Sequence, residues 1–434
     1  MEKRKRIIKI VALTTAAAVV CGAFAGCGAG GGKAELLTAQ AQEDVVYESD
    51  VDTEEATSAM TGFSLDFMKA AMEYAEEENP VLSPASAYLA LVLLACGSGG
   101  ETAQELSEVL RIPEGEWASY GSTIQEWLNR SNGETTIKTA DSVWFDSDGG
   151  YEAKQEYLDT VSEALKAEVY KANLQSKGTI EDINKWVNDA TDGLIEKLRE
   201  EPYDDLVRAV LLNALYFEAK WSYPFEAEAT AEKTFTTADG KEITTDFLRD
   251  YGCHRYYLEA DGIEGIMLPY TDGEEYTEGD TAFIALRSTD GKTPEEVLEA
   301  VSPEMLREFA SVEETTYMNF SMPKFDINYY QDLNDTFAAV GLKHTMSDGG
   351  ADLSNMFENE EGSAMDLDAA QIVRIQVDEE GTKAAAVTEI AASETAMIVE
   401  EPIELHFDSP FLYMIIDTET GMPIFMGILE NPAQ

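Results

Sequence analysis

The chain has 434 residues, of which 44% are hydrophobic and 26% are charged, so it can fold around a large buried core. Its formal net charge of −54 repels nucleic acid and anionic lipid, and we therefore exclude both as ligands. We interpret the charge as an aid to solubility, with electrostatic steering toward basic partner proteins as the alternative.

The N-terminal residues have the features of an export signal. Four basic residues precede an apolar run that ends at Phe24, and Gly26-Cys27 and a glycine-rich stretch follow. This arrangement resembles a bacterial lipobox, in which the cysteine carries lipid. We therefore predict a signal peptide over residues 1–26 and an extracellular protein anchored to the outer face of a bacterial membrane, which it contacts only through lipid on Cys27. An uncleaved membrane anchor is the alternative.

Residues 27–60 are rich in glycine and then in acidic residues, and they lack apolar periodicity. They are therefore predicted to form a flexible tether. The folded domain is expected over residues 61–434, with no internal repeat or linker that would divide it. Its free cysteines are Cys96 and Cys253. Cys96 is expected to be a small buried residue, with a disulfide to Cys253 as the alternative. No spacing of Cys and His indicates zinc, and we expect no metal and no cofactor.

Hydrophobic periodicity places helices and strands along the domain. A helical face begins at Phe63, and further helices are expected at Ser83–Leu94, Thr102–Leu110, Lys154–Glu168, Ile180–Lys197, Pro294–Phe309 and Asp332–Val340. Strands are expected at Thr136–Phe145, Ala209–Phe217, Gly265–Leu268, Thr281–Leu286, Thr316–Met322, Ile372–Val377 and Leu405–Ile416. The elements intermix without a regular βαβ repeat, which predicts an α+β fold.

The segment from Glu379 to Ser393 is unusual for a loop because it contains no Pro, Asn or Asp. Written with a period of two, its charges after Gly381 all fall on one face. The other face is small or apolar throughout and carries Thr382, Ala384, Ala386, Thr388, Ile390 and Ala392. This pattern predicts a loop that can join a sheet as a strand with one buried face. A helix is the alternative for the alanine run, but the β-branched residues argue against it.

Seven fragments, in order and at fitting distances, resemble the serpin family over residues 60–434. They are Asn79–Ser86, Gly99–Ala103, Ile183–Val187 with Thr191–Gly193, Leu212–Phe217 with Trp221 and Pro224-Phe225, Leu268–Tyr270, Glu379–Ala386, and Phe407–Phe411 with Phe425–Gly427 and Asn431-Pro432. The resemblance implies a fold of three β-sheets and about nine helices. It also implies an exposed reactive-centre loop at about residues 379–403.

In this family a target protease cleaves the loop, the cut loop inserts into the main sheet, and the acylated protease is trapped. The resemblance therefore implies a serine protease inhibitor that acts as a suicide substrate and is not itself an enzyme. It implies a hinge formed by Glu379, Gly381, Thr382, Ala384, Ala385 and Ala386. It also implies a region where the sheet opens, at Ser83, Ser86, Asn213, Trp221 and Gln371.

The family's spacing from the hinge glycine places the cleaved bond at Thr395-Ala396, with Ala396-Met397 and Met397-Ile398 as alternatives. No Arg or Lys occurs between Ala384 and Asp408, so trypsin-like targets are not expected. Small and apolar residues there indicate an elastase-like or subtilisin-like serine protease, with a cysteine protease as a further candidate partner. We expect a monomer. The absence of a basic cluster argues against an activator of the heparin type.

Where the family commonly has a histidine in the opening region, this chain has Gln371. A glutamine both donates and accepts hydrogen bonds, so we expect it to satisfy Ser83 and Asn213 without titrating. Two other functions are alternatives to protease inhibition. A hydrolase is disfavoured because the chain has three histidines and no G-x-S-x-G or H-E-x-x-H motif. The second alternative is a non-inhibitory serpin that acts as a surface binding lipoprotein.

Overall fold

We analysed the fold in a computed structural model, which describes residues 34–38, 47, 49–129, 135–149, 152–204, 207–271, 273, 278–358, 364–382 and 401–433. All of these residues belong to one compact unit. The signal peptide, Cys27 and the loop from residue 383 to 400 lie outside the described residues. Of the helices in the described ranges, none combines the length and the apolar character that a membrane span requires.

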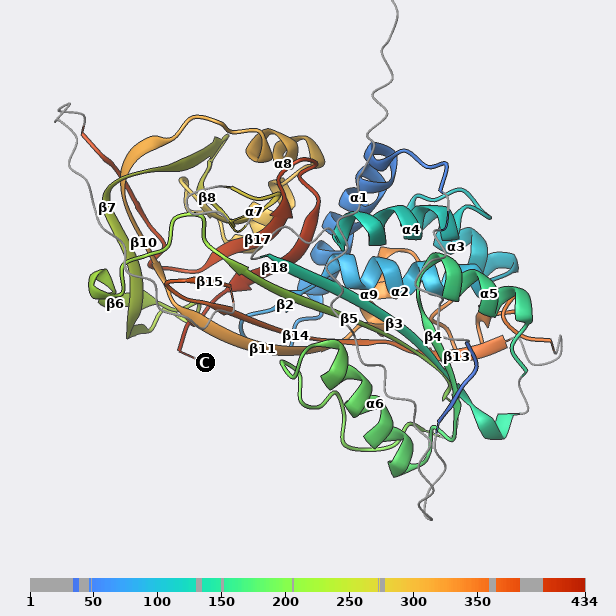
Figure 1. The fold of residues 1–434 in the computed structure, drawn as a ribbon. Helices are drawn as coiled ribbons and strands as arrows, with labels where there is room; N and C mark the ends of the chain where they lie inside the picture. The colour runs from blue at the N-terminus through green and yellow to red at the C-terminus, as the bar shows by residue number, and fades with distance from the viewer. Residues whose placement is uncertain are drawn as a thin grey trace, which may run out of the picture. The chain divides into compact units, whose positions relative to one another are not determined.

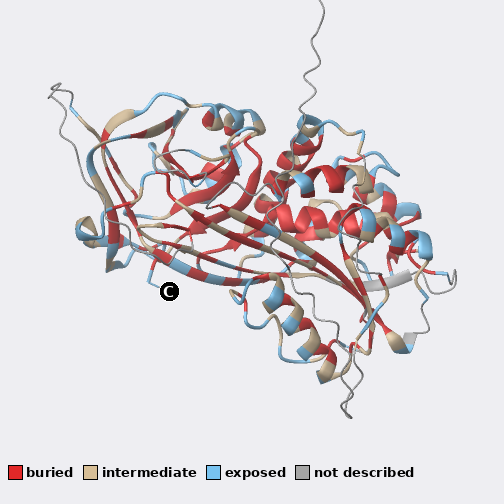
Figure 2. Cartoon of the chain, viewed as in Figure 1, coloured by how far each residue is buried: buried red, intermediate tan, exposed pale blue. Residues whose placement is uncertain are grey.

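The described residues form nine α-helices, which confirms the expected number. These are α1 (Thr53–Glu73), α2 (Pro84–Gly97), α3 (Gly100–Leu110), α4 (Trp117–Leu128), α5 (Gln155–Ala164), α6 (Lys177–Ala190), α7 (Pro294–Ala300), α8 (Pro303–Ala310) and α9 (Asn334–Val340). Helix α2 is buried on nearly all sides and lies against the main sheet (Figure 2). It begins where Ser83 accepts a hydrogen bond from the amide of Ser86, with Pro84 in the first turn.

The main sheet has the strand order β1-β4-β3-β5-β15-β14-β11. Its strands are β1 (Glu35–Leu36), β4 (Glu168–Ala172), β3 (Thr136–Asp146), β5 (Val207–Lys220), β15 (Gly381–Thr382), β14 (Ala370–Val377) and β11 (Phe325–Asp332). Strand β13 (Ala364–Asp368) pairs with the start of β5 and with β12 (Ala351–Asp352). Helix α6 covers one face of the sheet, and α2 with its neighbours covers the other (Figure 1).

The remaining strands form a second hydrogen-bonded network. They are β16 (Ile403–His406), β10 (Thr316–Pro323), β7 (Glu242–Ala260), β8 (Ile263–Pro269), β9 (Thr281–Ser288), β17 (Phe411–Asp417), β18 (Pro423–Leu429), β2 (Val81–Leu82) and β6 (Ala231–Thr236). The long strand β7 pairs with β6 and β10 along its first part and with β8 along its last. Two of the three expected sheets are therefore continuous through β7, and the α+β fold is confirmed.

The tether expected over residues 27–60 is wrong in two parts of its described range. Helix α1 begins at Thr53, before the expected start of the domain at residue 61, because Asp52 caps it and Ala56 is already part of the core. Farther upstream, Glu35 and Leu36 pair with β4 as an edge strand. The acidic residues on the exposed side of α1 give this segment the composition of a tether, although its other side carries an apolar stripe.

Several expected elements end elsewhere because a local signal stops them. The helix expected over Pro294–Phe309 is two helices, since Ser302 caps a new one that Pro303 begins. The helix expected over Lys154–Glu168 ends at Ala164, and the one expected over Ile180–Lys197 ends at Ala190. The run Leu405–Ile416 likewise divides between β16 and β17.

Candidate functional site

The start of the reactive loop is already part of the main sheet. Gly381 and Thr382 form β15, which is antiparallel to β5 through the pairs Gly381↔Lys220 and Thr382↔Ala219, and to β14 through Val377↔Thr382. A Cβ atom on Gly381 would lie 2.1 Å from the carbonyl oxygen of Ala219. The close approach of the two backbones therefore requires glycine at position 381.

The side chain of Thr382 is held beneath the sheet. It is 2% exposed, and its Oγ1 lies 2.6 Å from the hydroxyl oxygen of Tyr270. The ring of Tyr270 stacks on Trp221, with 4.7 Å between the ring centroids, and Trp221 donates from Nε1 to the carbonyl oxygen of Asp378 at 2.9 Å. Burial raises the pKa of Tyr270, so this hydroxyl keeps its proton. Trp221 thus contacts the start of the turn that leads into β15 directly, and Thr382 after the turn through Tyr270.

A second set of contacts fixes the turn between β14 and β15. The carboxylate of Asp378 accepts a hydrogen bond from the amide of Glu380 at 2.9 Å. Glu379 forms an ion pair with Lys324 at 2.7 Å and accepts a hydrogen bond from Thr230 at 2.7 Å. Partial burial opposes ionisation of Glu379, but the bonds from Lys324 and Thr230 outweigh it and lower the pKa of this carboxyl.

Beyond β15 the main sheet has an open slot between β5 and β14. Within the described strands, β5 pairs on this edge only with β15 at Ala219 and Lys220 and with β13 near Val210. No ladder joins residues 211–218 of β5 directly to β14 in the described part of the chain. Two cavities of about 50 and 30 Å³ lie at the slot, and Asn213 and Gln371 line both of them. Between the pairings of β5 with β15 and with β13, the facing edges of β5 and β14 are thus unpaired in the described residues.

The wall of the slot contains the residues predicted for the opening region. The amide oxygen of Gln371 accepts from the backbone amide of Ser83 at 2.7 Å, and its nitrogen donates to the Ser83 carbonyl at 3.1 Å. Ser86 is 2% exposed and lines both cavities. Gln371 therefore satisfies Ser83, as expected.

The expected bond from Gln371 to Asn213 is absent from the described contacts, and this prediction is wrong. Asn213 donates instead from Nδ2 to the carboxylate of Asp141 at 2.7 Å, and its buried Oδ1 has no partner among the described residues. The reason is geometric: the open slot separates the strands that carry the two amides, and Gln371 uses both polar atoms of its amide on Ser83.

Three residues of this site were not predicted from the sequence: Asp141, Lys324 and, as a partner of the hinge, Tyr270. Only Asp141 left a signal. It is a charged residue on the face of β3 that also carries the buried side chains of Ile137 and Val143. The predicted hinge residues Ala384, Ala385 and Ala386 and the predicted cleavage site at Thr395, Ala396 and Met397 lie outside the described residues.

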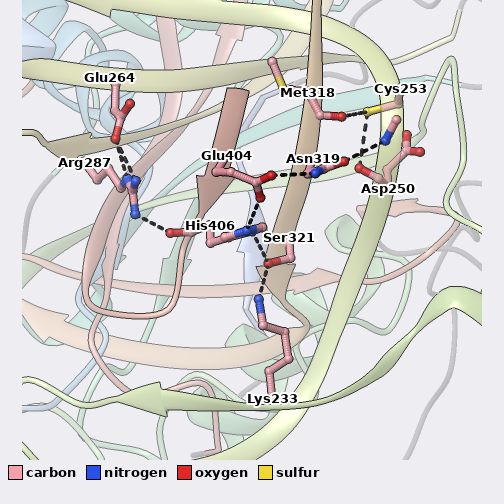
Figure 3. Close-up of polar contacts among 11 residues, drawn as sticks. Lys233, Asp250, Cys253, Glu264, Arg287, Met318, Asn319, Ser321, Glu404 and His406 are labelled. Atoms are coloured by element: carbon pink, nitrogen blue, oxygen red, sulfur yellow. Dashed lines mark hydrogen bonds and ion pairs between the residues drawn. The ribbon is translucent and has the colours of Figure 1, made fainter. Parts of the chain in front are cut away.

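A second polar cluster holds β16, the strand that follows the reactive loop. His406 lies 2.9 Å from the hydroxyl of Ser321 through Nδ1 and 3.0 Å from Glu404 through Nε2, and Lys233 donates to Ser321 at 2.8 Å (Figure 3). The order Ser–His–Glu is that of a hydrolytic triad. Ser321 is fully buried, however, so no substrate reaches it. Since Ser321 belongs to β10, the cluster acts as an attachment of β16 to β10.

These features match a known family. The family model for serpins, described as serine protease inhibitors, matches residues 58–432. Serpin-ZXA of Oryza sativa subsp. japonica is 30% identical over 364 residues, which span 82% of this chain and 90% of its own. An uncharacterized serpin-like protein of Thermococcus kodakarensis is 29% identical and covers 86% of this chain and 85% of its own.

Solved structures agree with the sequence relatives. The native state of the thermophilic serpin tengpin superposes with a TM-score of 0.80 at 25% identity, over 92% of this chain and 100% of its own. The latent state of tengpin superposes with a TM-score of 0.72 at 24% identity, over 89% of this chain and 100% of its own. Proteins of the family act on proteases as inhibitors and are not enzymes. From the open slot, the inserted hinge and these relatives we conclude that the chain belongs to the serpin family of serine protease inhibitors.

Proposed function

We propose that this serpin inhibits a serine protease as a suicide substrate, by inserting its cleaved loop into the slot between β5 and β14. The observation that carries the proposal is β15, where Gly381 and Thr382 already occupy the top of the slot in register with both walls. Below β15 the slot is bounded by backbone edges without a ladder in the described residues, as far as the pairing of β13 with β5 near Val210. A strand that continued β15 would complete the sheet.

The register of β15 supports the period of two in the loop sequence. Continued from Thr382↔Ala219, the ladder places Thr388 opposite Asn213 of β5. Continued from Val377↔Thr382, the other ladder places the same Thr388 opposite Gln371 of β14. The pairings with β5 and with β14 thus place the inserted loop in the same register. The even-numbered loop residues would then share the inner face with Thr382, and these are the small and apolar residues of the loop.

Insertion on this register is favourable for two physical reasons. The facing β5 residues Leu211, Leu215 and Phe217 belong to or pack against the main core, so the inner face of the loop would be buried there. At ~25 cal/mol per Å², several buried side chains contribute on the order of ten kcal/mol. The backbone edges of β5 and β14 would also gain hydrogen bonds, each contributing about 1 kcal/mol net. The uncleaved protein is therefore the higher-energy arrangement.

The residues proposed for cleavage define the target. Thr395, Ala396 and Met397 have small or unbranched side chains, which suit the pockets of elastase-like or subtilisin-like proteases. A cysteine protease with a similar pocket is a secondary candidate. Trypsin-like enzymes are not proposed, since no Arg or Lys lies between Ala384 and Asp408.

A panel of proteases tests the proposal. The protein is incubated with an elastase, a subtilisin and trypsin, and products are separated in SDS. We expect an SDS-resistant adduct with the elastase or the subtilisin and none with trypsin. Mass spectrometry of the released peptide should place the cut between Thr395 and Ile398, and the cleaved protein should melt at a higher temperature. Cleavage in the loop without an adduct and without a higher melting temperature would favour a non-inhibitory binding lipoprotein instead.

We also propose that the serpin domain is displayed outside the cell on a lipid attached to Cys27 after removal of residues 1–26. The proposal is supported by the basic and apolar N-terminal run and the Gly26-Cys27 junction. Replacement Cys27→Ser should release the protein from the membrane fraction into the medium. Equal membrane retention of both proteins would contradict lipid anchoring and favour an uncleaved anchor.

A further inference from the structure

One buried carboxyl group beside the slot has no role in the mechanism above. Asp141 lies in β3 and is 4% exposed. Its Oδ1 accepts from Nδ2 of Asn213 at 2.7 Å, and its Oδ2 accepts from Nε2 of Gln125 at 3.3 Å. Both of these partners are neutral amides, so among the described contacts this carboxylate is buried without a cation.

Among the described residues around Asp141, none supplies a positive charge that would keep it ionised. Burial raises its pKa to about 7, and the bond from Asn213 opposes this only in part. On this side of the sheet, the packed helices and β5 carry three kinds of described titratable group. The neutral groups are Tyr88, Cys96, Tyr120 and Tyr157. The exposed carboxylates are Glu126, Glu156, Asp159 and Glu163, and the far end of β5 carries Glu218 and Lys220.

The other neighbours of β3 direct their charges elsewhere. Glu168 of β4 accepts a hydrogen bond from Trp186 of α6 and so lies on the side of the sheet that α6 covers (Figure 1). Lys171 of β4 pairs with Glu152 at 3.0 Å. The charged residues of α6 lie on the opposite side of the sheet from Asp141, since Asp141 shares its face with Val143 of the main core. The protonation of Asp141 therefore depends on its burial and on its amide partners.

Asn213 connects this carboxyl to the slot. The Nδ2 of Asn213 donates to Asp141, and the Oδ1 of Asn213 is left as an acceptor without a partner in the described residues. Asn213 also lines the cavities of about 50 and 30 Å³ at the slot. Spaces of this size hold water, which stabilises a nearby charge. A strand in the slot would displace that water and further desolvate the pair. Because desolvation disfavours the charged form, insertion of the strand favours a protonated Asp141.

We propose that Asp141 is a positioning residue that acts through Asn213 and makes strand insertion between β5 and β14 dependent on pH, faster when Asp141 is protonated. The proton comes from solvent and no bond to another group is formed. In the ionised state Asn213 must donate to Asp141 and present Oδ1 to the slot. In the protonated state Asp141 can donate to Oδ1, and an amide flip presents Nδ2 instead. This inference rests on the proposed function, since it concerns the strand that fills the slot.

A synthetic peptide of residues 382–392 provides a probe that no protease activity complicates. The uncleaved full-length protein is incubated with the peptide between pH 5.5 and 8.5, and the rate of complex formation is followed by native electrophoresis. For the wild type we expect the rate to fall about tenfold as pH rises through the titration of Asp141, a factor that corresponds to a difference of one pKa unit between the two forms. Asp141→Asn keeps the shape, and its amide can accept from Gln125 and donate to Oδ1 of a flipped Asn213 as a protonated Asp141 would, so it should give a flat profile.

The control Asp146→Asn changes a buried carboxyl at the end of the same strand and should retain the wild-type profile. A flat wild-type profile, or the same slope in Asp141→Asn, would overturn the role of Asp141 while leaving insertion intact. Failure of the peptide to anneal at any pH would overturn insertion into the slot and this inference with it. Infrared difference spectra provide a second measurement: a protonated carboxyl band should be present below pH 7 in the wild type and absent from Asp141→Asn.

Discussion

Replacement of the hinge glycine tests how much the inserted residues contribute to the native state. In Gly381→Ala the new Cβ atom would meet the backbone of β5 at 2.1 Å from the oxygen of Ala219 and 2.8 Å from Cα of Lys220. Neither backbone atom can move without distortion of β5, so β15 should leave the sheet. Its pairs with β5 and β14 and the bond from Thr382 to Tyr270 would be lost. At a net ~1 kcal/mol each for the contact with β5, the contact with β14 and the bond to Tyr270, the loss is about 3 kcal/mol.

Hydrogen exchange measures this loss locally. A decrease of about 3 kcal/mol in the free energy of opening corresponds to roughly a hundredfold faster exchange in residues 378–382 and at the end of β5. The matched control is Thr382→Ser, which keeps the hydroxyl group for Tyr270 and should exchange nearly as slowly as the wild type. Equal protection of the hinge in Gly381→Ala and wild type would refute the argument that close packing at this glycine holds the loop in the sheet.

Three further predictions concern stability. Lys324→Met removes the partner of Glu379, whose pKa is lowered on folding. The ion pair therefore stabilises the protein above the usual range of a glutamate and less as pH falls through the lowered value, and the variant should lose about 1 kcal/mol in urea titrations at pH 7 but little in acid. A pH-independent loss would show that packing is responsible. Because the pKa of Asp141 is raised to about 7, the folded state holds its proton more tightly and stability should fall as pH rises from about 4 to about 7, by up to ~4 kcal/mol. Asp141→Asn should abolish that slope, and an unchanged slope would assign it to other groups. Deletion of residues 28–40 removes β1 from β4 and should cost about 1 kcal/mol in thermal unfolding, whereas an unchanged melting temperature would show that the edge pair contributes nothing.

Local patterns were sufficient where one segment decides its own structure. The apolar run after Ser83 predicts the buried helix α2, and the alternation of Ile372–Val377 predicts β14. The α+β class follows from the mixture of such patterns. The predicted elements were wrong where the deciding sequence signal was short or where the pairing strand lies far away in the sequence. The two residues of β1 form a strand only because β4 offers an edge, and composition alone assigned them to a tether.

The candidate site divides in the same way. The loop sequence by itself determined that residues after Gly381 carry one small, apolar face, since side chains alternate in any extended strand. Only the tertiary structure decided that the edges of β5 and β14 beside it are unpaired, that the hinge has already taken the first two positions between them, and that Asn213 turns toward Asp141 and away from Gln371. The physical reason is that the walls of the slot come from strands more than a hundred residues apart. Their separation depends on the packing of the whole sheet, which no local pattern records.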